Sequence, residues 1–155
     1  MRTIAEMLRW RARRHPSLDA VWFDGKSCTF AQFNESTSQL AAGLLDKLGL
    51  QGGDRVGILD KNCAAYFELF FALDKAGLVA APLNWRLTPP EIKQIVDDVK
   101  PKLMVTGPEF KATAAATGVP TMTFADLPRG GDDPRRDVDG AVCAQFCTSG
   151  TTGLP

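Results

Sequence analysis

Arg55-Val-Gly-Ile-Leu59 and Leu78-Val-Ala-Ala-Pro-Leu83 decide the fold, together with residues 62–77 between them. Both stretches are short and apolar without alternation, which is typical of strands buried on both faces of a parallel sheet. Asn62 begins and Gly77 ends a stretch with apolar side chains on several sides. It predicts a helix from Ala64 to about Ala76 that is buried or lines a hydrophobic cavity. The order strand–helix–strand predicts a right-handed βαβ unit. The expected fold class is therefore α/β, built from βαβ units, with a mainly parallel sheet flanked by helices.

Further elements of the same kind follow toward the C-terminus. Thr88 is a suitable N-cap, and two prolines sit in the first turn, where a missing N–H costs little. A helix to about Asp98 follows, and after it the sequence predicts a strand, a short alanine-rich helix and a second strand at Lys102–Thr106, Glu109–Ala116 and Val119–Phe124. Pro120 restricts the last of these strands to a sheet edge or a strand start.

The N-terminal region begins with two capping-box patterns, Thr3–Glu6 and Thr29–Gln32, which predict helices to about His15 and to about Leu48. Between them, the segment 21–30 predicts a β-hairpin, because Asp-Gly supplies its tight turn. The basic side of the first helix is expected to face solvent, with contact to an anionic membrane surface as the alternative. His15, the single histidine, is expected at the solvent-facing end of that helix rather than as a general base.

Composition limits the classes of function. Of the 155 residues 45% are apolar and 23% charged, and eighteen basic residues balance eighteen acidic ones, so no electrostatic attraction to nucleic acid is expected. No apolar stretch approaches the roughly 20 residues of a membrane span, and the first residues lack the pattern of a secretory signal. The four cysteines match no zinc spacing. They are interpreted as reduced thiols of a cytoplasmic protein, with no metal site.

The last part of the chain carries the candidate site. A charged, glycine-rich stretch, 129–140, predicts a solvated surface loop. Residues 141–147 then predict a buried strand. Six hydroxyl or glycine residues follow it, namely Thr148, Ser149, Gly150, Thr151, Thr152 and Gly153. Glycines permit close backbone approach to a ligand, successive N–H groups bind anions, and hydroxyls donate to phosphate oxygens. An ordinary loop is the alternative, and the Walker-type P-loop pattern is not met because Leu154 follows Gly153.

Thr148-Ser-Gly-Thr-Thr-Gly-Leu-Pro155 resembles the signature phosphate loop of the adenylate-forming (AMP-binding) superfamily, which includes acyl-CoA synthetases, luciferases and peptide-synthetase adenylation domains. The order and spacing of Gly53–Val56, Lys75–Gly77 and Ala81–Asn84 are similar to the same family. The resemblance covers Thr3–Pro155, roughly a quarter to a third of a family member. It implies a partial N-terminal AMP-binding domain, residues 1–155, that ends inside the phosphate-loop motif, one residue before the lysine of that motif.

The resemblance implies an ATP-dependent acyl-CoA synthetase, in which carboxylic acid, ATP and CoA give acyl-CoA, AMP and pyrophosphate through an acyl-adenylate, with Mg²⁺ accompanying ATP. The family's catalytic residues come later in its sequences, so none is assigned here. We expect these residues alone to be inactive, with weak or absent ATP binding. One alternative is a truncated, non-catalytic protein or interaction module that self-associates through exposed apolar surface. Another is an enzyme of the same superfamily that adenylates amino acids or aryl acids.

Overall fold

A parallel sheet forms the centre of the molecule in the computed structural model, which describes residues 3–147. Within these residues the strand order is β4-β3-β5-β6, and all three pairings are parallel. The strands are β3 (Arg55–Leu59), β4 (Val79–Pro82), β5 (Leu103–Thr106) and β6 (Thr121–Thr123). Gly57 sits opposite Ala81 on one side and Met104 on the other. The predicted α/β class is confirmed, and β6 is an edge strand that begins directly after Pro120, in agreement with the prediction.

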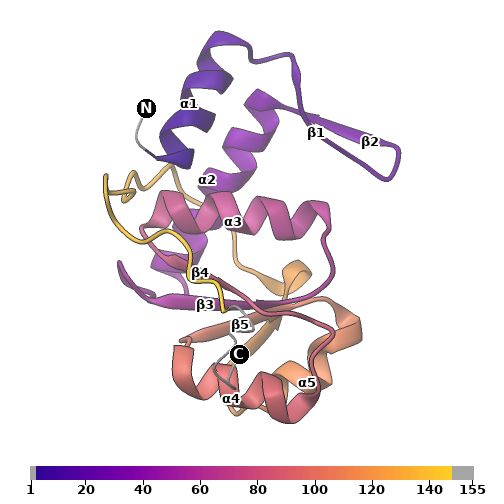
Figure 1. The fold of residues 1–155 in the computed structure, drawn as a ribbon. Coiled ribbons are helices and arrows are strands. Elements are labelled where there is room, and N and C mark those ends of the chain that lie inside the picture. Colours follow the sequence, from indigo (N-terminus) through magenta and orange to yellow (C-terminus); the bar gives the residue numbers. More distant parts are fainter. Residues whose placement is uncertain (1–2, 148–155) are drawn as a thin grey trace.

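Helices cover both faces of this sheet (Figure 1). One face packs against α2 (Phe30–Asp46) and α3 (Ala64–Ala76), and α1 (Ile4–Arg14) lies on those two helices. The opposite face is covered by α4 (Pro89–Val99) and α5 (Lys111–Ala115). Two short 3₁₀ turns, η1 (Pro108–Phe110) and η2 (Phe124–Asp126), complete the connections. No helix of residues 3–147 is long and apolar enough to span a membrane.

Local signals set the helix ends. The Thr29 hydroxyl accepts a hydrogen bond from the Gln32 backbone N–H, and the Gln32 side-chain oxygen accepts one from the Thr29 backbone N–H. The predicted capping box is therefore present. Gly77 ends α3 in the left-handed conformation, with φ of 67°, where a residue with a Cβ is strained. The helix predicted from Ala64 to about Ala76 is confirmed as α3, but Asn62 is not the residue that initiates it. Its N-cap is Cys63, whose sulfur accepts from the backbone N–H of Tyr66.

The predicted hairpin is confirmed as β1 (Asp19–Phe23) and β2 (Lys26–Thr29). Asp24 and Gly25 have φ of 49° and 75°, which are the two positive values that a two-residue hairpin turn requires. The hairpin projects away from the sheet and helices (Figure 1). Trp22 near its turn is 73% exposed. At its base, Ala20, Val21 and Cys28 pack against a small hydrophobic cluster of Leu8, Phe33 and Phe71.

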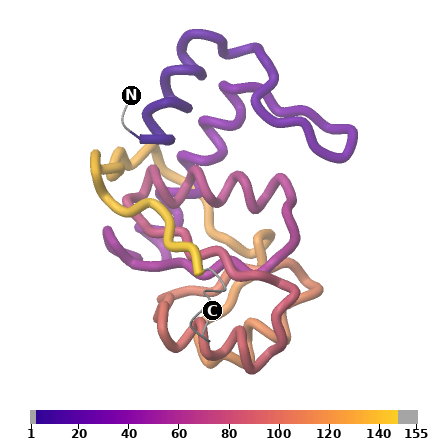
Figure 2. The backbone as a smooth tube through the Cα atoms, in the orientation of Figure 1, coloured from indigo at the N-terminus to yellow at the C-terminus, as the bar shows by residue number. Residues whose placement is uncertain are grey.

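Residues 127–140, here called the crossover segment, connect the two edges of the sheet without regular structure. They leave η2 beyond the β6 edge, pass the helices α1, α2 and α3, and return beside β4 (Figure 2). The segment packs closely on α2, because a Cβ on Gly43 would lie 2.0 Å from the carbonyl oxygen of Pro128. The Gly130 N–H also donates to the Gln39 carbonyl at 3.0 Å. The predicted loop is therefore irregular, as expected, but it is fixed against three helices.

The predicted buried strand at 141–147 is wrong in burial and nearly absent as a strand. A single parallel bridge joins Ala144 to Ala80 of β4. Two hydrogen bonds make it, from the Ala80 N–H to the Cys143 carbonyl at 2.9 Å and from the Gln145 N–H to the Ala80 carbonyl at 2.8 Å. Val142 and Phe146 remain 65% and 66% exposed. The reason is position, because this segment lies outside β4 and no described strand pairs with its other side.

Candidate functional site

The six predicted phosphate-loop residues, Thr148 to Gly153, lie outside the described residues, so their role stays a prediction. The structure does describe the chain that leads to them. Residues 141–147 run parallel to β4 and therefore toward the carboxyl ends of the strands. Cys147 packs against the hydrophobic cluster that contains Leu83 and Trp85, just beyond the end of β4. Ligands of open parallel α/β sheets bind at the carboxyl ends of the strands, so the chain approaches the predicted site from the appropriate side.

A cluster of charged and aromatic side chains, here called the carboxyl-edge cluster, lies beyond the ends of β3, β4 and β5. Its members are Lys61, Trp85, Arg86, Glu109 and Phe110. The Lys61 ammonium lies 5.1 Å from the centre of the Trp85 ring and 2.8 Å from a Glu109 carboxylate oxygen. The Arg86 guanidinium stacks 4.2 Å above the Trp85 ring. Two exposed cations held over aromatic faces form a surface suited to a phosphate-bearing or planar ligand.

Each member of the carboxyl-edge cluster follows soon after a strand, which explains its place. Lys61 comes just after β3, Arg86 just after β4, and Phe110 just after β5. Gly107 lets the β5 turn approach the β3 turn, because a Cβ there would lie 2.2 Å from an Asp60 carboxylate oxygen. Sequence reasoning missed this cluster. It could have been predicted from the general rule that residues directly after parallel strands lie together at the carboxyl edge of the sheet.

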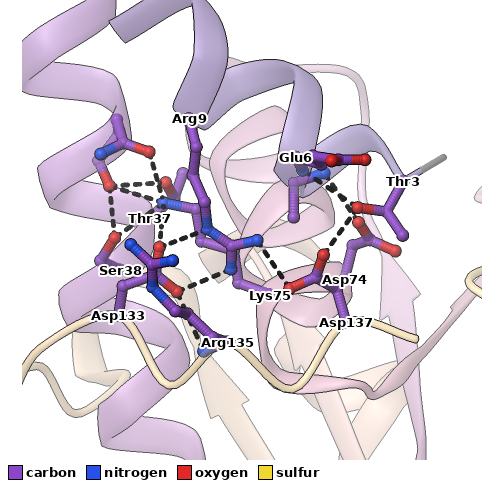
Figure 3. Close-up of polar contacts among 12 residues, drawn as sticks. Thr3, Glu6, Arg9, Thr37, Ser38, Asp74, Lys75, Asp133, Arg135 and Asp137 are labelled. Atoms are coloured by element: carbon purple, nitrogen blue, oxygen red, sulfur yellow. Dashed lines mark hydrogen bonds and ion pairs between the residues drawn. The ribbon is translucent and has the colours of Figure 1, made fainter. Parts of the chain in front are cut away.

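A second group of charges is buried between the crossover segment and the helices, and is here called the anchor cluster: Thr3, Arg9, Asp74, Lys75, Asp133 and Asp137 (Figure 3). The Arg9 guanidinium donates two bonds to the Asp133 carboxylate at 2.6 and 2.7 Å and one to Asp137 at 2.7 Å. The Thr3 hydroxyl donates to the other Asp137 oxygen at 2.7 Å. Arg9 is only 9% exposed. The predicted solvent-facing basic side of the first helix is therefore wrong at Arg9, because carboxylates from distant residues cover it.

Lys75 of α3 lies close to the Arg9–Asp133 ion pair and is completely buried. Its ammonium donates to the carbonyl and side-chain oxygens of Asn34, both at 2.8 Å, and to the Ser38 hydroxyl at 2.7 Å. The nearest Asp133 oxygen is 3.7 Å away. All three ammonium protons thus have oxygen acceptors, which is the condition for burying a lysine.

Burial and pairing shift the pKa values of these groups. Burial lowers the pKa of Lys75 to about 8, although Asp133 acts in the opposite direction. Burial alone would lower the pKa of Arg9, but its hydrogen bonds to Asp133 and Asp137 outweigh this effect and raise it. Burial opposes ionisation of Asp133 as well, yet the bonds from Arg9 and the Arg135 backbone lower its pKa below the usual range. Arg9 and Asp133 are therefore both ionised at neutral pH.

A second ion pair holds the beginning of the crossover segment. The Arg129 guanidinium donates to both oxygens of Glu68 on α3, each at 2.7 Å, and the Ser36 hydroxyl of α2 donates to the same carboxylate. Burial raises the pKa of Glu68, but the bonds from Arg129 and Ser36 dominate and lower it. The stretch predicted as a solvated connector therefore places paired carboxylates and a guanidinium against the helices. Sequence reasoning could not have matched these partners, which are far apart in the chain.

The remaining candidate groups are the four cysteines and the single histidine. The four cysteines are free, as the expectation of reduced thiols requires. His15 is the C-cap of α1, at the predicted end of that helix. Residues 3–147 contain no cluster of three or more histidine, cysteine or acidic side chains arranged to hold a metal ion.

Comparison with known proteins identifies the family. Residues 8–155, and so the whole hydroxyl- and glycine-rich loop, match the family of AMP-binding enzymes. The chain belongs to this AMP-binding family. It is 32% identical to the fatty acid–[acyl-carrier-protein] ligase ScoC of Streptomyces coeruleorubidus, over 100% of this chain and 32% of that protein. It is 35% identical to feruloyl-CoA synthase of an Amycolatopsis species, over 94% of this chain and 30% of that protein.

Solved structures of the AMP-binding family share the fold. The O-succinylbenzoate coenzyme A synthetase MenE from Bacillus subtilis, in complex with AMP, superimposes with a TM-score of 0.83 at 25% identity. The superposition covers 96% of this chain and 40% of that one. The chain thus spans about a third of the length of its curated relatives. It corresponds to the N-terminal AMP-binding region of acyl-CoA and fatty-acid ligases.

Proposed function

We propose that this chain is the N-terminal part of an ATP-dependent acyl-CoA synthetase of the cytoplasm. A carboxylic acid attacks the α-phosphate of ATP to give an acyl-adenylate and pyrophosphate, and the CoA thiol then displaces AMP to give the thioester. The observation that carries this proposal is the family match through Thr148–Gly153, on a chain that approaches the carboxyl ends of a parallel sheet.

The phosphate loop supplies the donors for ATP in this proposal. Backbone N–H groups around Gly150 and Gly153 and the hydroxyls of Thr148, Ser149, Thr151 and Thr152 hold the β- and γ-phosphates. These groups are neutral, so they position the triphosphate without cancelling its charge. Mg²⁺ bound to the phosphates supplies that compensating charge. The contribution of this chain is to hold the pyrophosphate leaving group in a fixed place while the carboxylate attacks.

The carboxyl-edge cluster is our candidate surface for the phosphates or adenine of CoA. CoA combines a planar base with several phosphates, and this surface combines aromatic rings with the exposed cations Lys61 and Arg86. The relatives named above act on a fatty acid, ferulic acid and succinylbenzoate, to judge from their names. The proposed substrate class is therefore a carboxylic acid, aliphatic or aryl.

The test is a chimera in which residues 1–155 replace the matched N-terminal part of the Amycolatopsis feruloyl-CoA synthase. Pyrophosphate release with ferulate, ATP and CoA is measured after circular dichroism has verified folding. We expect activity that falls at least about tenfold in the Thr151→Val variant, which removes a phosphate donor. Lys93 is exposed, so Lys93→Met is the matched control and should leave the rate unchanged. A folded chimera whose activity is equal in all three forms contradicts the proposed role of the loop.

A second candidate function, a non-catalytic interaction module, is favoured by one observation. Val138, Val142 and Phe146 are 63–66% exposed, and a groove of about 650 Å³ opens between the segment 141–145 and the amino ends of β3 and β4. Exposed apolar side chains beside an unpaired sheet edge favour association. Sedimentation velocity of the 155-residue chain distinguishes the two. Self-association that a Val142→Ser, Phe146→Ser variant abolishes supports the module, and a monomer at all concentrations contradicts it.

A further inference from the structure

The crossover segment carries the chain over the longest irregular path in the part of the molecule that the structure describes. It starts at the β6 edge, and residues 141–147 after it pair beside β4, at the opposite edge (Figure 2). Irregular backbone has no repeating hydrogen bonds to fix its course. The place of residues 141–147 therefore depends on side-chain and backbone contacts along the way.

Pairing with β4 is too limited to fix those residues by itself. The contact is one isolated bridge with two hydrogen bonds, and Val142 and Phe146 on either side of it are largely exposed. Strand register is strongly specified only where one face of the strand is buried. The other contacts of this stretch are few: Ala144 and Cys147 pack against the core clusters, and the Arg55 guanidinium donates to the Gln145 side chain at 2.9 Å. Further contacts that fix the register come from the chain that precedes it.

The anchor cluster supplies these contacts. Arg9 fixes two points of the crossover segment at once, by a forked pair to Asp133 and a single bond to Asp137. The Thr3 hydroxyl completes the Asp137 contact. Arginine is suited to this task because its planar guanidinium presents several donors in a rigid arrangement. Asp137 lies shortly before Ala144 in the sequence, and the Ala141 N–H bond to the Val138 carbonyl at 3.1 Å shortens the path between them.

The α3 helix contacts the same part of the crossover segment. The Arg136 N–H donates to the Lys75 carbonyl at 2.9 Å. Gly77 allows close contact, since a Cβ there would lie 2.6 Å from the Arg136 carbonyl oxygen. The buried Lys75 ammonium lies next to Asp133. The segment just before residue 141 thus contacts both α1, through Arg9, and α3, through Lys75 (Figure 3).

We propose that Arg9, acting through Asp133 and Asp137, is a positioning residue that sets the register of residues 141–147 on β4 and thereby the place where the phosphate loop begins. The effect on nucleotide binding rests on the proposed function of that loop. The effect on register does not, and the experiment separates the two.

The first measurement is amide hydrogen exchange of the 155-residue chain, followed by NMR. We expect Arg9→Met to accelerate exchange of the Gln145 N–H, the donor of the bridge, at least about tenfold. The β5 amides should change less, because they report the stability of the whole sheet. Asp137→Asn, which weakens one contact only, should give a smaller effect on Gln145. Lys93→Met removes an exposed ion pair on α4 and serves as the control.

Equal acceleration at Gln145 and in β5 would mean that Arg9 stabilises the fold as a whole and positions nothing, and no change at Gln145 would also overturn the proposal. If Arg9→Met does not fold, Asp137→Asn decides by the same comparison. The second measurement is Mg²⁺-ATP affinity of the active chimera by calorimetry, where Arg9→Met should weaken binding at least about tenfold against Lys93→Met. A chimera that binds no ATP refutes the proposed function and leaves the exchange result to judge the positioning role.

Discussion

Raising the pH above neutrality should stabilise this protein through Lys75. Its ammonium is completely buried, and burial lowers its pKa from 10.5 to about 8. Between these two values the unfolded chain binds a proton that the folded chain has lost, so the free energy of unfolding rises with pH. One pKa unit corresponds to about 1.4 kcal/mol, which gives about 3 kcal/mol in total and about 2 kcal/mol between pH 7 and pH 9.5.

Other groups act in the opposite direction, and a difference measurement removes them. Burial raises the pKa of Tyr66 to about 12 and also raises that of Cys28. Folding therefore disfavours their ionisation, so their contribution to stability falls as the pH rises through their unfolded pKa values. Urea denaturation of the wild type and of Lys75→Met at pH 7 and pH 9.5 isolates the lysine. The wild type should gain about 2 kcal/mol relative to the variant over this interval.

The control is Lys93→Met, because Lys93 is exposed and its removal should leave the pH dependence of the wild type unchanged. Parallel pH dependence of the wild type and Lys75→Met, within about 0.5 kcal/mol, would refute the argument that burial dominates at Lys75. If Lys75→Met does not fold, NMR titration of the Lys75 side chain in the wild type decides. A pKa near 10.5 would show that the site favours the ammonium as much as water does.

Three further outcomes follow from single contacts. Gly43→Ala should destabilise the protein by about 1–3 kcal/mol, measured by urea denaturation, because the new Cβ would collide with the Pro128 carbonyl. Thr29→Ala should cost about 1 kcal/mol through the lost capping box, seen as a lower thermal midpoint, and Thr29→Ser should restore it. Arg86→Ala in the active chimera should raise the KM for CoA about tenfold and leave that for ATP unchanged; equal KM values for CoA would remove Arg86 from the proposed surface.

Local chemistry made most of the fold predictable from the sequence. The Thr29 capping box, the Asp24-Gly25 turn and the Gly77 helix end each depend on residues within a few positions of one another, and each is present. The continuously apolar strands β3 and β4 predicted a parallel sheet because such strands need cover on both faces. The remaining errors at element ends, such as the end of α2 at Asp46 rather than at about Leu48, amount to one or two residues.

The failures concern contacts between distant parts of the chain. A charged stretch such as 129–140 has the composition of a solvated loop. Nothing within it reveals that Asp133 will pair with Arg9, or that Arg129 will pair with Glu68. The apolar run 141–147 has the composition of a buried strand, yet burial depends on neighbours on both sides, and the described residues supply only β4. Burial of a segment is a property of its surroundings, whereas apolarity is a property of its residues.

The same distinction applies to the phosphate loop, whose anion-binding role is indicated by its resemblance to a family and not by its residue types alone. Hydroxyl and glycine residues alone fit an ordinary loop, because anion binding requires N–H groups to converge, and convergence depends on how the preceding chain enters. In the anchor-cluster proposal, this entry is set by Arg9, Asp133 and Asp137, outside the loop itself. A phosphate loop attached to a loosely paired edge segment would then owe its geometry to a guanidinium on the first helix. Exchange at Gln145 in Arg9→Met measures that dependence directly, since its N–H makes the last described hydrogen bond to β4 before the loop begins.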